Sequence, residues 1–301
     1  MKELVSETIG LCREGKYVSL ATRGKNKIKQ IINKNLFADL RINRLQTAAD
    51  DDRRLIGTVL ELAREDKSPT DDLNLFNMIN AKRVELSRIT TVSRFNEYIG
   101  EDQYDFGDLS EQEADETIRT NIAEAAKCPN TKGRILYYLI RNSNAQSGLE
   151  LGTSVGMSGL YEASAAQQTG GEIVTLDGSQ IRAAVAKKTF ADADLDNITV
   201  VPGIFTDTLP DVLAEYSPFD FVFIDGHHDE IATKQYWNMI KPEIESGGLV
   251  VFDDIHWSRG MERAWKAICR DEQFDPIVET NNYGIGVVKP NSRTVPKRIS
   301  I

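Results

Sequence analysis

Cysteines and long apolar runs are scarce in this sequence. Its 301 residues include three cysteines, Cys12, Cys128 and Cys269, which lie too far apart for a metal-binding spacing or a disulfide framework. Separate thiols are typical of a reducing compartment, so we expect a cytoplasmic protein. No run of about 18 apolar residues is present, which argues against a membrane-spanning helix. The first residues also lack the apolar segment of a secretory signal.

Basic residues are outnumbered by acidic ones. The chain has 36 Lys and Arg against 46 Asp and Glu, which gives a formal net charge of −10. This balance argues against broad binding to nucleic acid. Residues 13–44 are an exception, with nine basic and two acidic side chains. A basic helix there could contact an anionic membrane surface, although a solvated basic face is the simpler interpretation.

The first 130 residues contain few strand-like runs and repeat apolar side chains at helical spacing. We expect one helix over residues 73–89, capped by Asp71 or Asp72. A second helix is expected over residues 111–127, where a serine and a glutamate form a capping-box pattern. The sequence therefore predicts a helical N-terminal region that extends over residues 1–130.

The remaining residues, 131–301, alternate short apolar strands with helices. The run Phe219–Ile224 is apolar almost throughout, as a buried parallel strand should be. About three residues separate the last two strands, so these two must be antiparallel. The pattern predicts an α/β domain with a mostly parallel sheet, helices on both faces and a closing antiparallel hairpin. The strands are expected at residues 147–151, 172–176, 198–201, 219–224, 248–252, 276–280 and 284–289.

A turn containing two glycines follows the first expected strand. Gly152 and Gly156 let the backbone approach a ligand and expose N–H groups at the start of a helix. A dinucleotide-binding turn would need a glycine where Ser154 stands. Its absence, with the acidic Glu150 two residues before Gly152, favours a ligand without a pyrophosphate. A tight strand–helix turn that binds nothing is the alternative.

An acidic residue ends the second expected strand. Asp177 follows Gly156 by 21 residues, and a carboxylate at this position accepts hydrogen bonds from ribose hydroxyls in dinucleotide-binding folds. A role in a turn or a helix cap is the alternative, because Gly178 and Ser179 come next.

Three further carboxylates follow the fourth and fifth expected strands. Asp225 ends the fourth strand, and Asp253 and Asp254 end the fifth. Ligands bind outside the carboxyl ends of strands in open α/β sheets, and carboxylate oxygens suit a hard divalent cation. The alternative is that one or two of these residues cap helices and only form hydrogen bonds.

All three histidines of the chain lie in the same two loops, at His227, His228 and His256. Histidine is the side chain best suited to proton transfer near neutral pH. Each histidine alone could be an ordinary polar loop residue. Their clustering favours chemistry at this edge of the sheet.

Residues 131–290 resemble the class I S-adenosylmethionine-dependent methyltransferases. The segment Glu150-x-Gly152-x-Ser154-x-Gly156 is similar to that family's E/D-x-G-x-G-x-G loop, with serine in place of the middle glycine. The resemblance implies a Rossmann-like methyltransferase fold, with a seven-stranded sheet whose reversed last strand belongs to the hairpin. It also implies that S-adenosyl-L-methionine is the cofactor. The residues implied at the cofactor are Glu150, Gly152, Thr153, Ser154, Gly156, Ser158, Asp177, Gly178, Gly203, Phe205 and Asp225.

Within this class the likeness is strongest to the cation-dependent O-methyltransferases of the catechol and macrocin types. The resemblance implies magnesium, or another divalent cation, at Asp225, Asp253 and Asp254. The catechol type carries a catalytic lysine three residues after the first aspartate, where this chain has His228. We therefore expect His228 as the general base, with His256 and then His227 as second and third candidates.

The sequence thus predicts methylation of a hydroxyl on a small molecule or a glycan. The helical N-terminal region is expected to cover the cleft and shape the pocket for the methyl acceptor, or else to form a structural cap or a homodimer surface. Whether a metal is bound stays open, because three carboxylates at strand ends also occur without one. N-methylation, nucleic-acid methylation and a nicotinamide oxidoreductase are weaker alternatives. A non-catalytic module that binds the cofactor or a nucleoside is the alternative from another functional class.

Overall fold

The computed structural model describes residues 45–64, 67–89, 94, 122, 126, 130–280 and 282–289. The chain divides into two compact units, residues 1–58 and 59–301. The expected helix over 111–127 and the basic segment 13–44 lie largely or wholly outside the described residues, and the division of the chain at residue 130 stays a prediction. In the described part, no helix is both long and apolar enough to cross a membrane.

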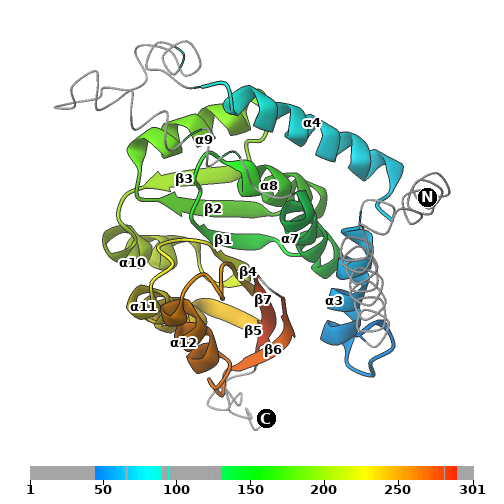
Figure 1. Cartoon of the computed structure of the whole chain (residues 1–301), viewed down its shortest axis with the longest axis vertical. Coiled ribbons are helices and arrows are strands. Elements are labelled where there is room, and N and C mark those ends of the chain that lie inside the picture. Colours follow the sequence, from blue (N-terminus) through cyan, green and yellow to red (C-terminus); the bar gives the residue numbers. More distant parts are fainter. Residues whose placement is uncertain are drawn as a thin grey trace, which may run out of the picture. The chain divides into compact units, whose positions relative to one another are not determined.

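A seven-stranded sheet forms the centre of the second unit (Figure 1). Its strands are β1 (Ser147–Leu151), β2 (Glu172–Asp177), β3 (Ile198–Pro202), β4 (Phe219–Ile224), β5 (Ile244–Phe252), β6 (Phe274–Glu279) and β7 (Gly284–Val288). They lie in the order β3-β2-β1-β4-β5-β7-β6. The first five run parallel, and β7 is antiparallel to both β5 and β6. The predicted sheet with its closing hairpin is therefore confirmed.

Helices cover the sheet in two groups, which Figure 1 shows with the strands between them. The first group is α7 (Asn130–Ser143), α8 (Met157–Thr169) and α9 (Gln180–Asp192). The second is α10 (Phe205–Tyr216), α11 (Glu230–Ile240) and α12 (Arg259–Ile268), with a short 3₁₀ turn, η3 (Lys241–Glu243), after α11. Helix α7 packs on α8, and α11 packs on α12. Of the earlier helices, α3 (Asp51–Leu62) crosses the boundary between the two units, and α4 (Thr70–Leu86) belongs to the second.

An aromatic cluster fixes the hairpin side of the sheet. The rings of Trp237, Phe252, Trp265 and Phe274 lie with centroids 5.3–6.0 Å apart, mostly edge to face. Each such pair stabilises the fold by about 0.5–1.5 kcal/mol beyond the burial of its surface. These contacts join α11 and α12 to strands β5 and β6. The loop after β5, which carries candidate functional residues, therefore follows a strand end that is held by packed aromatic rings.

The start of α4 corrects the predicted helix cap. Pro69 precedes the helix, and no side-chain hydrogen bond caps it. Asp72 is buried instead, and its carboxylate accepts hydrogen bonds from the hydroxyls of Tyr137 and Tyr138 and from Arg141 at 2.8–2.9 Å. Buried hydroxyls and a guanidinium satisfy this carboxylate in place of the N–H groups of its own helix. Asp72 therefore attaches α4 to α7.

Candidate active site

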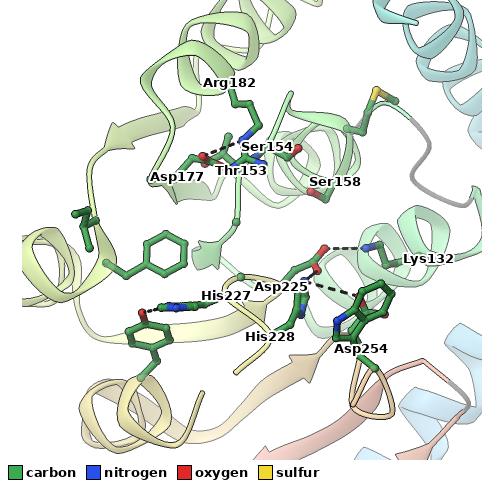
Figure 2. A pocket seen from close by; sticks show the side chains of 18 residues that line it. Lys132, Thr153, Ser154, Ser158, Asp177, Arg182, Asp225, His227, His228 and Asp254 are labelled. Carbon is green, nitrogen blue, oxygen red and sulfur yellow. Dashed lines mark hydrogen bonds and ion pairs between the residues drawn. The ribbon is translucent and has the colours of Figure 1, made fainter. Parts of the chain in front are cut away.

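The carboxyl ends of β1, β2, β4 and β5 surround a cavity of about 760 Å³ (Figure 2). Its walls carry residues from the turn after β1, from the end of β2 and from the loops after β3, β4 and β5. The predicted site residues that line it are Gly152, Thr153, Ser154, Ser158, Asp177, Gly178, Phe205, Asp225, His227, His228 and Asp254. Residues from separate parts of the sequence therefore meet at the edge of the sheet that the strand order predicts.

The turn after β1 depends on its two glycines for different reasons. Gly152 has φ +114°, and a Cβ atom there would lie 2.4 Å from the carbonyl oxygen of Asp225. Gly156 has φ +85°, and a Cβ atom there would meet the ring of Phe190 at 2.9 Å. Gly152 therefore brings the backbone close to the loop after β4, whereas Gly156 allows α8 to pack on α9. Ser154, which stands for a family glycine, also adopts a left-handed conformation with φ +50°.

Asp177 holds this turn in place. It is 3% exposed, and its Oδ2 accepts a hydrogen bond of 2.7 Å from the backbone N–H of Ser154. Its Oδ1 accepts a 2.7 Å bond from the N–H of Ser179 and lies 3.3 Å from Nε of Arg182. The carboxylate thus has the role in a turn that was the alternative interpretation of Asp177. It also lines the cavity. The two roles are compatible.

Glu150 is one of the residues that the resemblance implies at the cofactor. It is fully buried and does not line the cavity. Its carboxylate accepts hydrogen bonds from the hydroxyls of Ser158 and Thr175. Burial raises the pKa of Glu150 to about 7, although the two hydroxyl donors oppose this rise. Glu150 therefore contacts Ser158, which lines the cavity, and does not line the cavity itself.

A group of three potential cation ligands stands on the loops after β4 and β5. One ligand atom each from Asp225, His228 and Asp254 lie within 4.8 Å of one another. Nε2 of His228 is 3.6 Å from Oδ1 of Asp225 and 3.7 Å from Oδ2 of Asp254. Two carboxylates and one imidazole at this spacing fit a divalent cation. This group differs from the predicted one in one member, with His228 where Asp253 was expected.

Asp253 turns instead toward Lys132, a residue that the sequence reasoning missed. Nζ of Lys132 lies 2.6 Å from Oδ2 of Asp253 and 2.7 Å from Oδ2 of Asp225. Burial and the neighbouring Asp253 raise the pKa of Asp225 well above its ordinary value, while Lys132 opposes this rise. Nothing local in the sequence marks Lys132, because it lies on α7, 93 residues before Asp225 and 121 residues before Asp253.

The other two histidines occupy different surroundings. His227 lines the cavity, and its Nδ1 is 2.9 Å from the hydroxyl of Tyr236. His256 does not line the cavity, and its Nε2 lies 3.3 Å from a carboxylate oxygen of Glu279. The structure therefore brings two of the three candidate bases into the cavity.

Two of the residues that the resemblance implies at the cofactor, Gly203 and Phe205, follow β3. Phe205 lines the cavity, and Gly203 does not. The sequence reasoning singled out neither Lys132 nor Arg182 nor Tyr236, which also line the cavity. The ring of Trp257 stands beside His228, with centroids 6.4 Å apart, and is 72% exposed.

A second cavity of about 460 Å³ adjoins the carboxylate end of the first. The two share Lys132 and Asp254. Its other lining residues are polar or amphipathic and come from the start of α7, the end of β5 and the turn of the hairpin: Thr131, Asp253, Thr280, Asn282 and Tyr283.

Comparison with known proteins agrees with this architecture. Residues 149–255 match a family model described as a methyltransferase domain. A catechol O-methyltransferase from Niastella koreensis is 33% identical over 129 residues, which are 42% of this chain and 57% of that protein. The chain thus matches little more than half the length of this curated relative.

Two solved structures share the fold at 25% sequence identity and a TM-score of 0.50. One is an O-methyltransferase from Bacillus cereus in complex with SAH, for which the match covers 65% of this chain and all of that one. The other is cofactor-bound Rv0187 from MTB, with 56% and 86% covered. The family match runs from β1 to the first residues after β5 and so includes the turn after β1. Over residues 149–255 this chain therefore matches a methyltransferase domain in sequence, and its α/β fold is similar to that of the solved O-methyltransferase.

Proposed function

We propose that this protein uses S-adenosyl-L-methionine to methylate a hydroxyl group of a small polar molecule or a glycan, with the help of a divalent cation. One observation carries the proposal. A single cavity joins the turn after β1 and Asp177, at one end, to the group of Asp225, His228 and Asp254 at the other. A cofactor at the first end would present its methyl group to an acceptor at the second.

The chain offers a distinct contact for each part of this cofactor. The turn at Gly152–Ser154 and the hydroxyl of Ser158 line the cavity side by side and suit the methionine part of the cofactor. Asp177 suits the ribose hydroxyls, and Phe205 lies where the adenine would stack. The cofactor supplies a methyl group on a positively charged sulfur. The cavity walls hold donor and acceptor in line, which lowers the entropic part of the barrier.

The residues at the far end accept the proton that the acceptor loses. When the new carbon–oxygen bond forms, the carbon–sulfur bond breaks and the hydroxyl proton must leave. His228 lines the cavity, and its Nε2 lies 3.6 Å from Asp225 and 3.7 Å from Asp254, beside the place proposed for the acceptor hydroxyl. We assign His228 as the base on this ground.

A divalent cation such as Mg²⁺ would be held by Asp225 and Asp254, with His228 in reach as a third ligand. When bound, it would supply positive charge that favours the deprotonated acceptor oxygen. His228 cannot ligate a cation and accept a proton through the same nitrogen at the same time. Turnover of His228→Ala and of the wild type, each with and without a chelator, separates the two roles. If His228 is the base, His228→Ala has lower turnover than the wild type both with and without the chelator. If His228 is only a ligand, the variant has lower turnover only when the cation is present.

The second cavity supports a polar acceptor. Threonine, asparagine and tyrosine side chains surround it, together with Lys132 and two carboxylates. Such a lining pairs with hydroxyl groups rather than with an extended apolar surface. The exposed ring of Trp257 offers one flat apolar contact beside His228, which suits either an aromatic ring or the face of a sugar.

The proposal is tested by product formation. The protein is incubated with S-adenosyl-L-methionine and a panel of catechols, sugars and glycosides, and S-adenosylhomocysteine is measured by mass spectrometry. His256→Ala serves as the matched control for His228→Ala, because His256 lies outside the cavity. We expect acceptor-dependent product with the wild type and the control, and a loss of about a hundredfold or more in His228→Ala. Cofactor binding without turnover on any acceptor would favour the non-catalytic cofactor-binding module.

A further inference from the structure

Lys132 crosses from the first turn of α7 to the carboxyl ends of β4 and β5. Its Nζ atom contacts Asp225 and Asp253 at 2.7 and 2.6 Å, and Figure 2 shows it directed at Asp225. The lysine side chain is 15% exposed, and those of the two aspartates are 17% and 6% exposed. Nζ also lies 5.5 Å from the ring centre of Phe223. The ammonium group is therefore held in a largely enclosed position.

The two aspartates need a positive charge between them. Both carboxylates contact the same ammonium group and are largely removed from water, where two negative charges repel each other strongly unless a positive charge lies between them. Lys132 provides that charge. With its ammonium group 2.7 Å from Asp225 and 2.6 Å from Asp253, the site already holds one fixed positive charge where a divalent cation would supply its own.

Asp225 faces two positions for positive charge. Its Oδ2 contacts Lys132, and its Oδ1 faces His228 and the ligand group that includes Asp254. Asp253, on the Lys132 side, is drawn out of that ligand group. A divalent ion in this ligand group therefore has two aspartates as ligands, Asp225 and Asp254, and not the three that the sequence predicts.

We propose that Lys132 is a resident cation of this site, which positions Asp225 and Asp253 and competes with a divalent ion for their charge. Lys132 thereby keeps the binding of divalent cations weak and directs them to Asp225, His228 and Asp254. The inference rests on the proposed function, because it concerns the same cavity. Coulomb's law gives about a tenfold penalty for one unit charge roughly 6 Å from a divalent ion, even with the screening of water.

The test measures Mn²⁺ binding by the electron paramagnetic resonance signal of the free ion. Lys132→Met removes the charge and keeps the shape, and Lys132→Arg keeps the charge. Lys266→Met is the control, since Lys266 lies on α12 and is 67% exposed. Lys132→Gln, which retains hydrogen-bond donors without the charge, replaces the methionine variant if that variant does not fold. Cofactor binding to each variant is measured in parallel by calorimetry.

We expect Lys132→Met to bind Mn²⁺ about tenfold more tightly than the wild type, or better. Lys132→Arg and Lys266→Met should stay within about threefold of the wild type, because both keep the charge next to the aspartates. Tightening of less than about threefold, weaker binding, or no Mn²⁺ binding by the uncharged variants would overturn the proposal. Failure of the proposed function gives a different result, since no variant and not even the wild type would then bind S-adenosyl-L-methionine.

Discussion

Glu150 is a buried acid whose cost to the fold depends on pH. Burial raises its pKa from 4.5 to about 7, so the folded protein holds this proton more tightly than the unfolded chain does. As the pH rises from about 4.5 to about 7, the unfolded state releases the proton first, and stability falls. Above pH 7 the full penalty is about 3 kcal/mol.

The variant Glu150→Gln removes this titration and keeps the shape. The glutamine can still exchange hydrogen bonds with the hydroxyls of Ser158 and Thr175, so we expect a constant change of about 1 kcal/mol from their rearrangement. In addition, the free energy of unfolding of the variant, relative to that of the wild type, should rise by about 2–3 kcal/mol when the pH is raised from 5 to 8. Urea unfolding of both proteins without cofactor at the two pH values measures this difference.

Glu172→Gln is the matched control, since Glu172 is exposed at the start of β2. Its effect on the free energy of unfolding should be the same at pH 5 and pH 8. The reasoning fails if the difference between Glu150→Gln and the wild type is also the same at both pH values, or if the variant loses stability as the pH rises.

Two further predictions concern the frame of the cavity. Asp72→Ala leaves two tyrosine hydroxyls and a guanidinium without their shared acceptor, and should lower the free energy of unfolding by about 3 kcal/mol. Asp71→Ala, at an exposed neighbour, should change it by less than about 0.5 kcal/mol; equal losses in urea unfolding would contradict the account. Gly152→Ala places a Cβ atom 2.4 Å from a carbonyl oxygen, whereas Gly170→Ala, also at positive φ, meets nothing within 4 Å. Gly152→Ala should therefore lower the melting temperature and cofactor affinity more than Gly170→Ala does, and similar effects on both would show that the close approach does not matter.

Much of the sheet could be predicted because its signals are local. Apolar segments such as Phe219–Ile224 stand between polar turns, and the short link between the last two strands dictates their direction. Strand β5 begins at Ile244, before the expected residue 248, because its first residues are mostly exposed and polar and lack the apolar pattern. Helix α11 begins at Glu230, because Asp229 caps it by accepting hydrogen bonds from the N–H groups of two residues in its first turn.

The interior of the site was harder to predict because its partners are distant in sequence. The two adjacent aspartates after β5 carry the same chemistry, and only the fold shows that Asp253 turns to Lys132 while Asp254 joins His228. A lysine on a helix before the sheet has no spacing that links it to them. In the same way, the position of Glu150 near the glycines is typical of the family loop, but its side chain points inward to Ser158 and Thr175. The residue types predicted the chemistry of the site, whereas the packing of the fold determines where each side chain points.

The most direct test of the central claim is calorimetric titration with S-adenosyl-L-methionine of the wild type, Asp177→Ala and Asp207→Ala. Asp177 lines the cavity and holds the turn after β1, whereas Asp207 is exposed on α10. We predict saturable binding to the wild type and to Asp207→Ala, and binding at least about tenfold weaker in Asp177→Ala, from lost charge-assisted hydrogen bonds. No binding to the wild type, or equal binding to all three, would contradict the assignment of this cavity to the cofactor.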